Sequence, residues 1–309
     1  MNNQPNEGLR AIVSRPIDIQ PFVPESSTLA VEIGAASVCG KLSSQNTDHY
    51  LAIRLTRLQQ TLLTSLAAAD LPSRFEENSY ALLVADGLAG NTGARASRVA
   101  LATLAHLAIQ YGKWNVRVDP DTSRDIFAQG QFLYARVHDA VRNASRSDGR
   151  LASMATSLTA LYIAEDNLFF AHVGHSAAFL FRDGILTQLT NDHTEEPSAH
   201  ASHFSDGITR TIGGRRDMPH VDTEHIKLLT GDRLLLCTNG LTDVVTPDSI
   251  ADTLASRRRP MEDCARLIDL AVDHDGGDDV TAMLADYTLQ HAAELPSNGN
   301  ADVPSPETE

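Results

Sequence analysis

The sequence predicts an α+β fold in which helices cover largely antiparallel sheets. Expected strands occur in consecutive runs, and expected helices occur in pairs between those runs. A parallel α/β fold would instead alternate strand and helix regularly along the chain. Because no internal repeat or linker divides the core, we expect one domain over residues 28–290. A flexible N-terminal arm over 1–27 and a disordered acidic tail over 291–309 would flank it.

The expected strands are alternating or continuous apolar runs that end at turn residues. Polar residues 40–48 predict a hairpin of the first two strands, and residues 230–232 predict another between the eighth and ninth. Arg182–Asp183–Gly184 is a third hairpin turn. The strands cover residues 29–39, 49–55, 81–85, 157–164, 167–173, 177–181, 185–189, 226–229, 233–237 and 280–287.

Helical spacing of apolar residues defines the expected helices. They cover residues 55–75, 94–112, 121–146, 247–255 and 260–273. The first rests on Leu55, Leu58, Leu62, Leu63 and Leu66, and we interpret residues 55–70 as either a covering helix or a docking element for a partner. Residues 191–222 are polar and predict a surface loop.

Composition excludes several classes of function. A net charge of −15 argues against nucleic acid or an anionic membrane as the main partner. The three cysteines are far apart in the sequence and fit no metal or disulfide pattern, as in a reducing compartment. Residues 1–10 hold no signal-peptide core, and no apolar run has membrane-spanning length, so we expect a cytoplasmic protein.

Acidic and amide side chains gather at the ends of expected strands. The segments are Asn46–Thr47–Asp48, Asp86–Gly87, Asn239–Gly240 and Asp278–Asp279. Hard divalent ions take oxygen ligands, and two such ions hold both ends of a phosphoryl displacement. Each segment taken alone is equally typical of an ordinary turn, because Asp, Asn and Gly favour turns.

Eight motifs in order resemble the metal-dependent protein phosphatases of type 2C, in their compact bacterial form. Their order and spacing match that family over residues 31–287, although each motif alone is modest evidence. They are NTD at 46–48, VADGLAG at 84–90 with Ala96–Ser97 beyond it, MATSL at 154–158, AHVGHSAAFLFRDG at 171–184, LTNDHT at 189–194, TRTIGG at 209–214, GDRLLLCTNGLTDVV at 231–245 and GGDDVTAML at 276–284.

The resemblance implies a four-layer sandwich of two antiparallel sheets with helices outside. It also implies two Mg²⁺ or Mn²⁺ ions at one edge of the sheets. In that family's pattern Asp86 bridges the two ions, the Gly87 carbonyl binds the first, and Asp278 and Asn239 belong to the second. Asp48 would orient the attacking water. The implied activity is hydrolysis of phosphoserine and phosphothreonine in proteins, with a Ser/Thr kinase or its targets as partners.

Several departures from the family pattern fall on functional positions. Asn239 replaces a metal-binding acid, and its amide oxygen binds a hard cation without supplying charge. Ser43 replaces a phosphate-binding arginine. His175 replaces an acid that helps to hold a third, weaker ion in bacterial relatives. We therefore do not expect a third ion to bind here as it does in those relatives. The other departures are Thr47, Ala89 and Ala177.

The departures leave two main interpretations. One is an active phosphatase, its activity reduced by a weakened second metal site. The other is a degenerate domain that binds a phosphoprotein or regulatory partner with little turnover. A purely structural α+β protein would not need acids at matching strand ends.

Histidines outside the motifs carry less information. His175 lies at an expected strand end. We interpret it as a solvated side chain, in preference to a metal ligand or proton carrier. His200, His203 and His220 fit no standard zinc spacing.

Overall fold

The computed structural model describes residues 28–66, 74–88, 91–111, 120–146, 154–195, 207–214, 217–274 and 276–290. The predicted arm over 1–27 and the predicted tail over 291–309 lie outside these ranges. Among the described residues, no helix is both long enough and apolar enough to cross a membrane.

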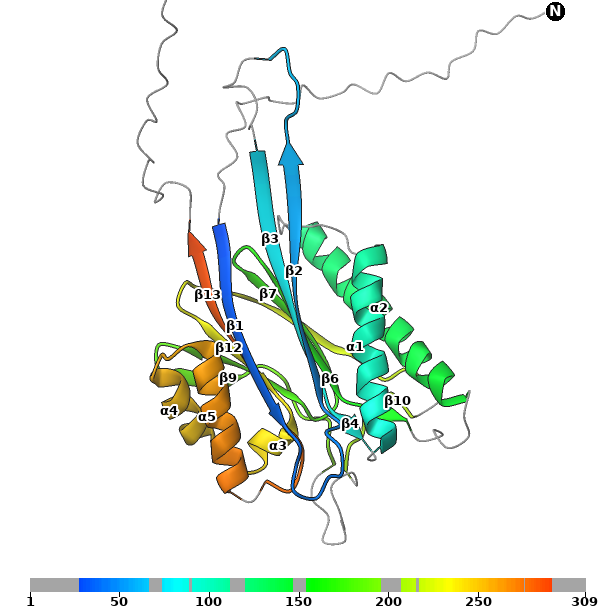
Figure 1. The fold of residues 1–309 in the computed structure, drawn as a ribbon. Helices are drawn as coiled ribbons and strands as arrows, with labels where there is room; N and C mark the ends of the chain where they lie inside the picture. Colours follow the sequence, from blue (N-terminus) through cyan, green and yellow to red (C-terminus); the bar gives the residue numbers. More distant parts are fainter. Residues whose placement is uncertain are drawn as a thin grey trace, which may run out of the picture.

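Two five-stranded sheets form the centre of the molecule (Figure 1). All of their neighbouring strands pair in antiparallel fashion. The first sheet has the order β1 (Thr28–Val38), β13 (Val280–Gln290), β12 (Arg233–Cys237), β8 (Ala177–Arg182) and β9 (Ile185–Gln188). The second has the order β11 (Asp222–Lys227), β7 (Asn167–Val173), β6 (Leu158–Ala164), β3 (Arg74–Ala85) and β2 (His49–Gln60).

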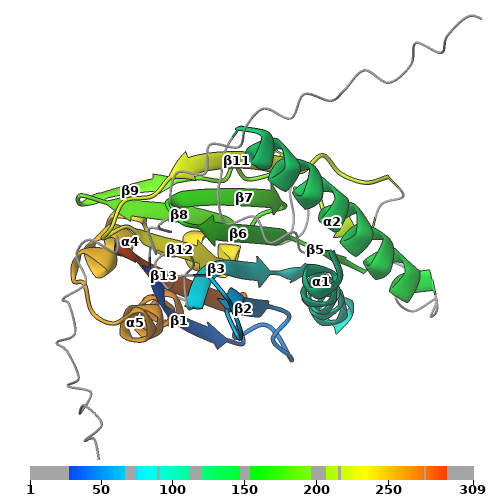
Figure 2. The same ribbon diagram turned by 90° about the horizontal axis from the view of Figure 1, so that it is seen from above.

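Helices cover the outer face of each sheet (Figure 2). α1 (Asn91–Tyr111) and α2 (Pro120–Arg146) pack on the second sheet, while α4 (Pro247–Ala255) and α5 (Pro260–Asp273) pack on the first. These helices lie where the apolar spacing predicts them. The predicted α+β class and its four-layer sandwich are therefore confirmed.

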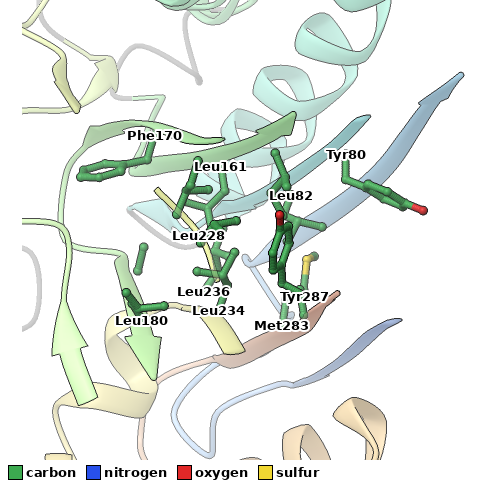
Figure 3. Packing of buried hydrophobic residues seen from close by; sticks show 14 of the residues in the cluster. Tyr80, Leu82, Leu161, Phe170, Leu180, Leu228, Leu234, Leu236, Met283 and Tyr287 are labelled. Atoms are coloured by element: carbon green, nitrogen blue, oxygen red, sulfur yellow. The ribbon is translucent and has the colours of Figure 1, made fainter. Parts of the chain in front are cut away.

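The main core lies between the two sheets. Leu82 and Leu161 of the second sheet meet Leu234, Leu236 and Met283 of the first (Figure 3). All five are fully removed from solvent. Burial of this apolar surface holds the sheets face to face.

Two of the predicted hairpins are wrong. β1 pairs with β13 rather than β2, and β11 pairs with β7 rather than β12. In both cases the polar connection crosses from one sheet to the other. The alternation of apolar and polar residues shows that a strand has a buried face, but it does not show which strand lies beside it. The hairpin of β8 and β9 is confirmed, with Asp183 and Gly184 at φ values of 51° and 81°.

The predicted helix over residues 55–75 is also wrong. Residues 55–60 continue β2, which pairs with β3 along its whole length from His49 opposite Ala85 to Gln60 opposite Arg74. Residues 61–66 are not helical, and residues 67–73 lie outside the described ranges. The leucines that suggested a buried stripe are largely exposed, Leu62 at 81% and Leu63 at 96%. Pairing with the neighbouring strand overrides the helical spacing.

A small third sheet was not predicted. It joins β4 (Gly87–Leu88), β5 (Ala155–Thr156) and β10 (Ile212–Gly213). β10 lies within the expected polar loop over residues 191–222, of which 196–206 and 215–216 lie outside the described ranges. Two-residue strands are too short for alternation to reveal them.

Candidate metal centre

The four acid-bearing segments meet at one end of the sandwich because of the strand register. Asp48 precedes β2 and Asp86 follows β3, and these strands pair His49 with Ala85 at that end. Asn239 follows β12 and Asp278 precedes β13, whose register places Cys237 opposite Ala282. The antiparallel pairing of β2 with β3 therefore brings Asp48 and Asp86 together in the second sheet. The pairing of β12 with β13 does the same for Asn239 and Asp278 in the first sheet.

Asp48 connects the two sheets. Its carboxylate Oδ2 accepts a 2.7 Å hydrogen bond from the hydroxyl of Thr238, the residue after β12. The side chain is buried, and its other oxygen, Oδ1, has no hydrogen-bond partner among the described residues. Burial raises the pKa of Asp48 well above its usual range, and the nearby Asp86 charge acts in the same direction.

Asp86 lies in the most acidic surroundings of the site. Burial raises its pKa to about 7, and the charges of Asp278 and Asp279 add to that rise. Its main-chain oxygen accepts bonds of 2.8 Å from the Ser157 amide and 2.6 Å from the Thr156 hydroxyl, which fix the strand end. A buried group surrounded by like charges is typical of a cation site.

Gly87 allows the first turn of α1 to approach this strand end. A Cβ atom on Gly87 would lie 2.3 Å from the Gly93 carbonyl oxygen, and a Cβ on Gly93 would lie 2.3 Å from the Gly87 oxygen. Only glycine at both positions allows such an approach. One turn further on, the Ser97 hydroxyl donates a 2.5 Å bond to the Thr47 main-chain oxygen.

Asn239 lies between two acids. Its amide nitrogen donates to Asp243 Oδ2 at 3.0 Å and to Asp278 Oδ2 at 3.5 Å. The nitrogen therefore faces the carboxylates, whereas a cation ligand must present its oxygen. Burial raises the pKa of Asp278, and the charges of Asp279 and Asp243 act in the same direction.

Asp279 has a structural role that differs from that of its neighbour Asp278, and the sequence alone did not distinguish the two residues. Its carboxylate accepts bonds from the Gly40 amide at 2.8 Å, the Thr47 amide at 2.7 Å and the Thr47 hydroxyl at 2.8 Å. These bonds satisfy the buried carboxylate and hold the segment before Asp48 in place. The polar segment 40–48 could have indicated this role, because its main-chain N–H groups needed a hydrogen-bond acceptor.

His175 lies at the edge of the site. Its Nε2 is 3.7 Å from Asp192 Oδ2 and 4.0 Å from Asp243 Oδ1, and its side chain is 22% exposed. These distances are too long for direct hydrogen bonds. His220 contacts Asp222 instead, and His200 and His203 lie outside the described residues.

His193 organises the loop beside the site. Its Nδ1 accepts a 3.1 Å bond from the Gly174 amide, and its Nε2 donates to Asp222 Oδ2 at 3.0 Å. Arg210 donates to the other oxygen of Asp222 at 2.8 Å. The motif residue His193 therefore shapes the loop and joins it to the strand end that carries His175.

The residues present suit a divalent metal ion. Within the described ranges, no three His, Cys, Asp or Glu side chains are arranged to hold an ion unaided. Mg²⁺-type sites need fewer, since they combine one or two carboxylates with main-chain oxygens and several waters. The unpartnered Oδ1 of Asp48 and the raised pKa of Asp86 are the features that a cation would relieve.

Comparisons with known proteins agree with this geometry. The family model described as "Protein phosphatase 2C" matches residues 69–272. The serine/threonine protein phosphatase PstP of Mycobacterium tuberculosis is 31% identical over 68% of this chain, and the match spans 42% of that relative. The serine/threonine phosphatase stp of Listeria monocytogenes is 29% identical over 69% of this chain and 87% of its own length.

A solved structure has the same fold. The catalytic domain of PstP in complex with two manganese ions superposes with a TM-score of 0.64 at 27% identity, over 84% of this chain and all of that one. This chain thus corresponds to less than half of the full-length mycobacterial relative and to its whole catalytic domain. The family match covers well over half of the chain, and the chain belongs to the protein phosphatase 2C family.

Proposed function

We propose that this protein is a metal-dependent phosphatase of phosphoserine and phosphothreonine in proteins. The observation that carries the proposal is the meeting of Asp48, Asp86 and Asp278 from three separate segments, where the strongest charges acting on Asp86 are all carboxylates. Such a site attracts divalent cations and needs them to hold an anionic phosphate.

Asp86, the Gly87 carbonyl, Asp278 and Asn239 would hold two Mg²⁺ or Mn²⁺ ions. To serve as a ligand, Asn239 must turn its oxygen toward Asp278, giving up the two bonds that its nitrogen donates. When bound, the ions supply Lewis-acid chemistry: they acidify water and offset the charge that develops on the phosphoryl group.

The chain's own residues position the reactants. Thr238 holds one Asp48 oxygen, so the free oxygen is left to accept a hydrogen bond from the attacking water. Asp279 keeps the segment before Asp48 in place through Gly40 and Thr47. Attack by water needs no covalent intermediate on the protein.

The relatives are named as phosphatases, which favours turnover over the alternative of a degenerate binding domain. Phosphoproteins would be the substrates, and a Ser/Thr kinase or its targets would be the partners in the cell. The missing arginine at Ser43 and the amide at Asn239 are consistent with a modest rate.

Hydrolysis of a phosphothreonine peptide and of an aryl phosphate, measured against Mn²⁺ concentration, tests the proposal. We expect Mn²⁺-dependent turnover that Asp86→Ala abolishes. Asp252→Ala, which removes an exposed acid on α4, should leave it unchanged. No turnover at any Mn²⁺ concentration, together with no metal binding by calorimetry, would contradict the proposal.

A further inference from the structure

A cavity lies away from the metal centre, between the outer face of the second sheet and the two helices that cover it. Its volume is about 160 Å³. The C-terminal half of α1, the middle of α2 and strands β2, β3, β6 and β7 contribute to its walls. The opposite, N-terminal end of α1 is the one that contacts Gly87, so the cavity and the metal centre lie along one helix.

Small residues leave this space open. Ala105 and Ala108 line it from α1, and Gly130 lines it from the interior of α2. A Cβ atom on Gly130 would meet nothing within 4 Å, and the residue has no left-handed backbone angle. Neither close packing nor conformation requires glycine there, although glycine weakens a helix interior. The absence of a side chain at Gly130 leaves open space in the wall of the cavity.

The lining suits an uncharged ring. Among the described residues that line the cavity, none has an acidic or basic side chain, so they offer a charged ligand no partner. Phe127 of α2 and Phe169 of β7 meet edge to face in its wall, with ring centroids 5.6 Å apart. This is a favourable arrangement for adding another aromatic ring. The hydroxyl of Tyr134, a polar group in the wall, already donates to the Ala171 main-chain oxygen at 2.7 Å.

The volume of the cavity matches a small ligand. Enclosed apolar cavities of about 150 Å³ bind benzene or xenon, and this cavity has a similar volume, although it opens to solvent on one side. We propose that this cavity is a binding site for a small uncharged aromatic molecule of a single ring. The site does not depend on the metal centre or on phosphatase activity.

Toluene serves as the probe, and the whole chain given in the sequence is used. We expect saturable binding in NMR titrations and a rise in the thermal unfolding midpoint. Crystals under xenon pressure should show density beside Gly130 and Phe127. The variant Gly130→Leu fills the space and should lose at least tenfold in toluene affinity. Ala128→Leu adds the same side chain at an exposed position of α2 and should bind as the wild type does.

Gly130→Leu must be shown to fold, and we expect it to unfold at a higher temperature than the wild type. Unchanged toluene affinity in that folded variant would overturn the proposal, as would the absence of saturable binding to the wild type.

Discussion

The Thr238 hydroxyl donates a 2.7 Å hydrogen bond to Asp48 Oδ2 and thereby ties the end of one sheet to the start of the other. Thr238 Oγ1 also accepts a 3.0 Å bond from the Thr281 amide, and this second bond orients the hydroxyl toward Asp48. This contact satisfies one oxygen of the Asp48 carboxylate, and the other, Oδ1, has no hydrogen-bond partner within the part of the chain that the structure describes.

Thr238→Val should therefore lower kcat more than it raises KM. The variant keeps the side-chain volume but leaves the buried Asp48 without a donor, at a cost of about 1–3 kcal/mol in the free energy of unfolding. Steady-state kinetics and urea unfolding measure the two effects. Thr238→Ser retains the hydroxyl and should recover most of both, and equal losses in the two variants would contradict the assigned role.

The metal-free protein should lose stability as the pH rises from about 4 to about 7. Asp86 has a pKa near 3.8 when unfolded and about 7 when folded, so the folded state retains a proton that the unfolded state has released. The stabilisation by that proton is complete below pH 4 and is lost as the pH approaches 7. Thermal unfolding with a chelator present measures the effect.

Asp86→Asn supplies the comparison for this pH dependence, because the amide does not titrate. The difference in unfolding free energy between wild type and variant should favour the variant increasingly from pH 4 to pH 7 and then level off. A difference that is independent of pH would show that Asp86 is charged throughout.

Asn239→Asp should destabilise the metal-free protein and strengthen its binding of Mn²⁺. In the metal-free protein it places a third carboxylate where the amide now contacts Asp243 and Asp278, so the unfolding midpoint should fall. With Mn²⁺ present, the added charge should tighten metal binding by at least tenfold, as measured by calorimetry. Weaker Mn²⁺ binding in the variant would contradict Asn239 as a ligand position. A sharp rise in activity would instead favour a degenerate wild-type site.

Gly93→Ala should destabilise the protein by about 1–3 kcal/mol, because its Cβ would collide with the Gly87 carbonyl. Displacement of α1 should also weaken Mn²⁺ binding. The matched substitution Gly130→Ala, on α2 where the space is open, should stabilise the protein by up to about 1 kcal/mol. Urea unfolding of both variants distinguishes steric collision from helix propensity.

Asp263→Ala should cost about 3–5 kcal/mol in stability without changing kcat. Asp263 is completely buried and accepts a 2.7 Å bond from Arg233, whose side chain is 1% exposed. Arg233 begins β12, while Asn239 follows the other end of that strand. The exposed pair of Lys227 and Asp166 is the control, and Asp166→Ala should cost no more than about 1 kcal/mol.

Local patterns predicted most of the secondary structure. The helices on both outer faces and the turn at Asp183–Gly184 follow from spacing and turn chemistry within one segment. The leucines over 55–66 misled because spacing along a chain does not show which backbone lies beside it. The two wrong hairpins have the same cause: a strand's pattern is equally compatible with either neighbour.

The sequence by itself determined the family, the fold class and the residues at which acids stand, since these depend on residue type and order. Only the tertiary structure decided how those acids differ. Asp279 is satisfied by Gly40 and Thr47, Asp48 is half satisfied by Thr238, and Asp86 is left among like charges. These differences arise from antiparallel register and burial, which bring together groups up to about 240 positions apart in the chain.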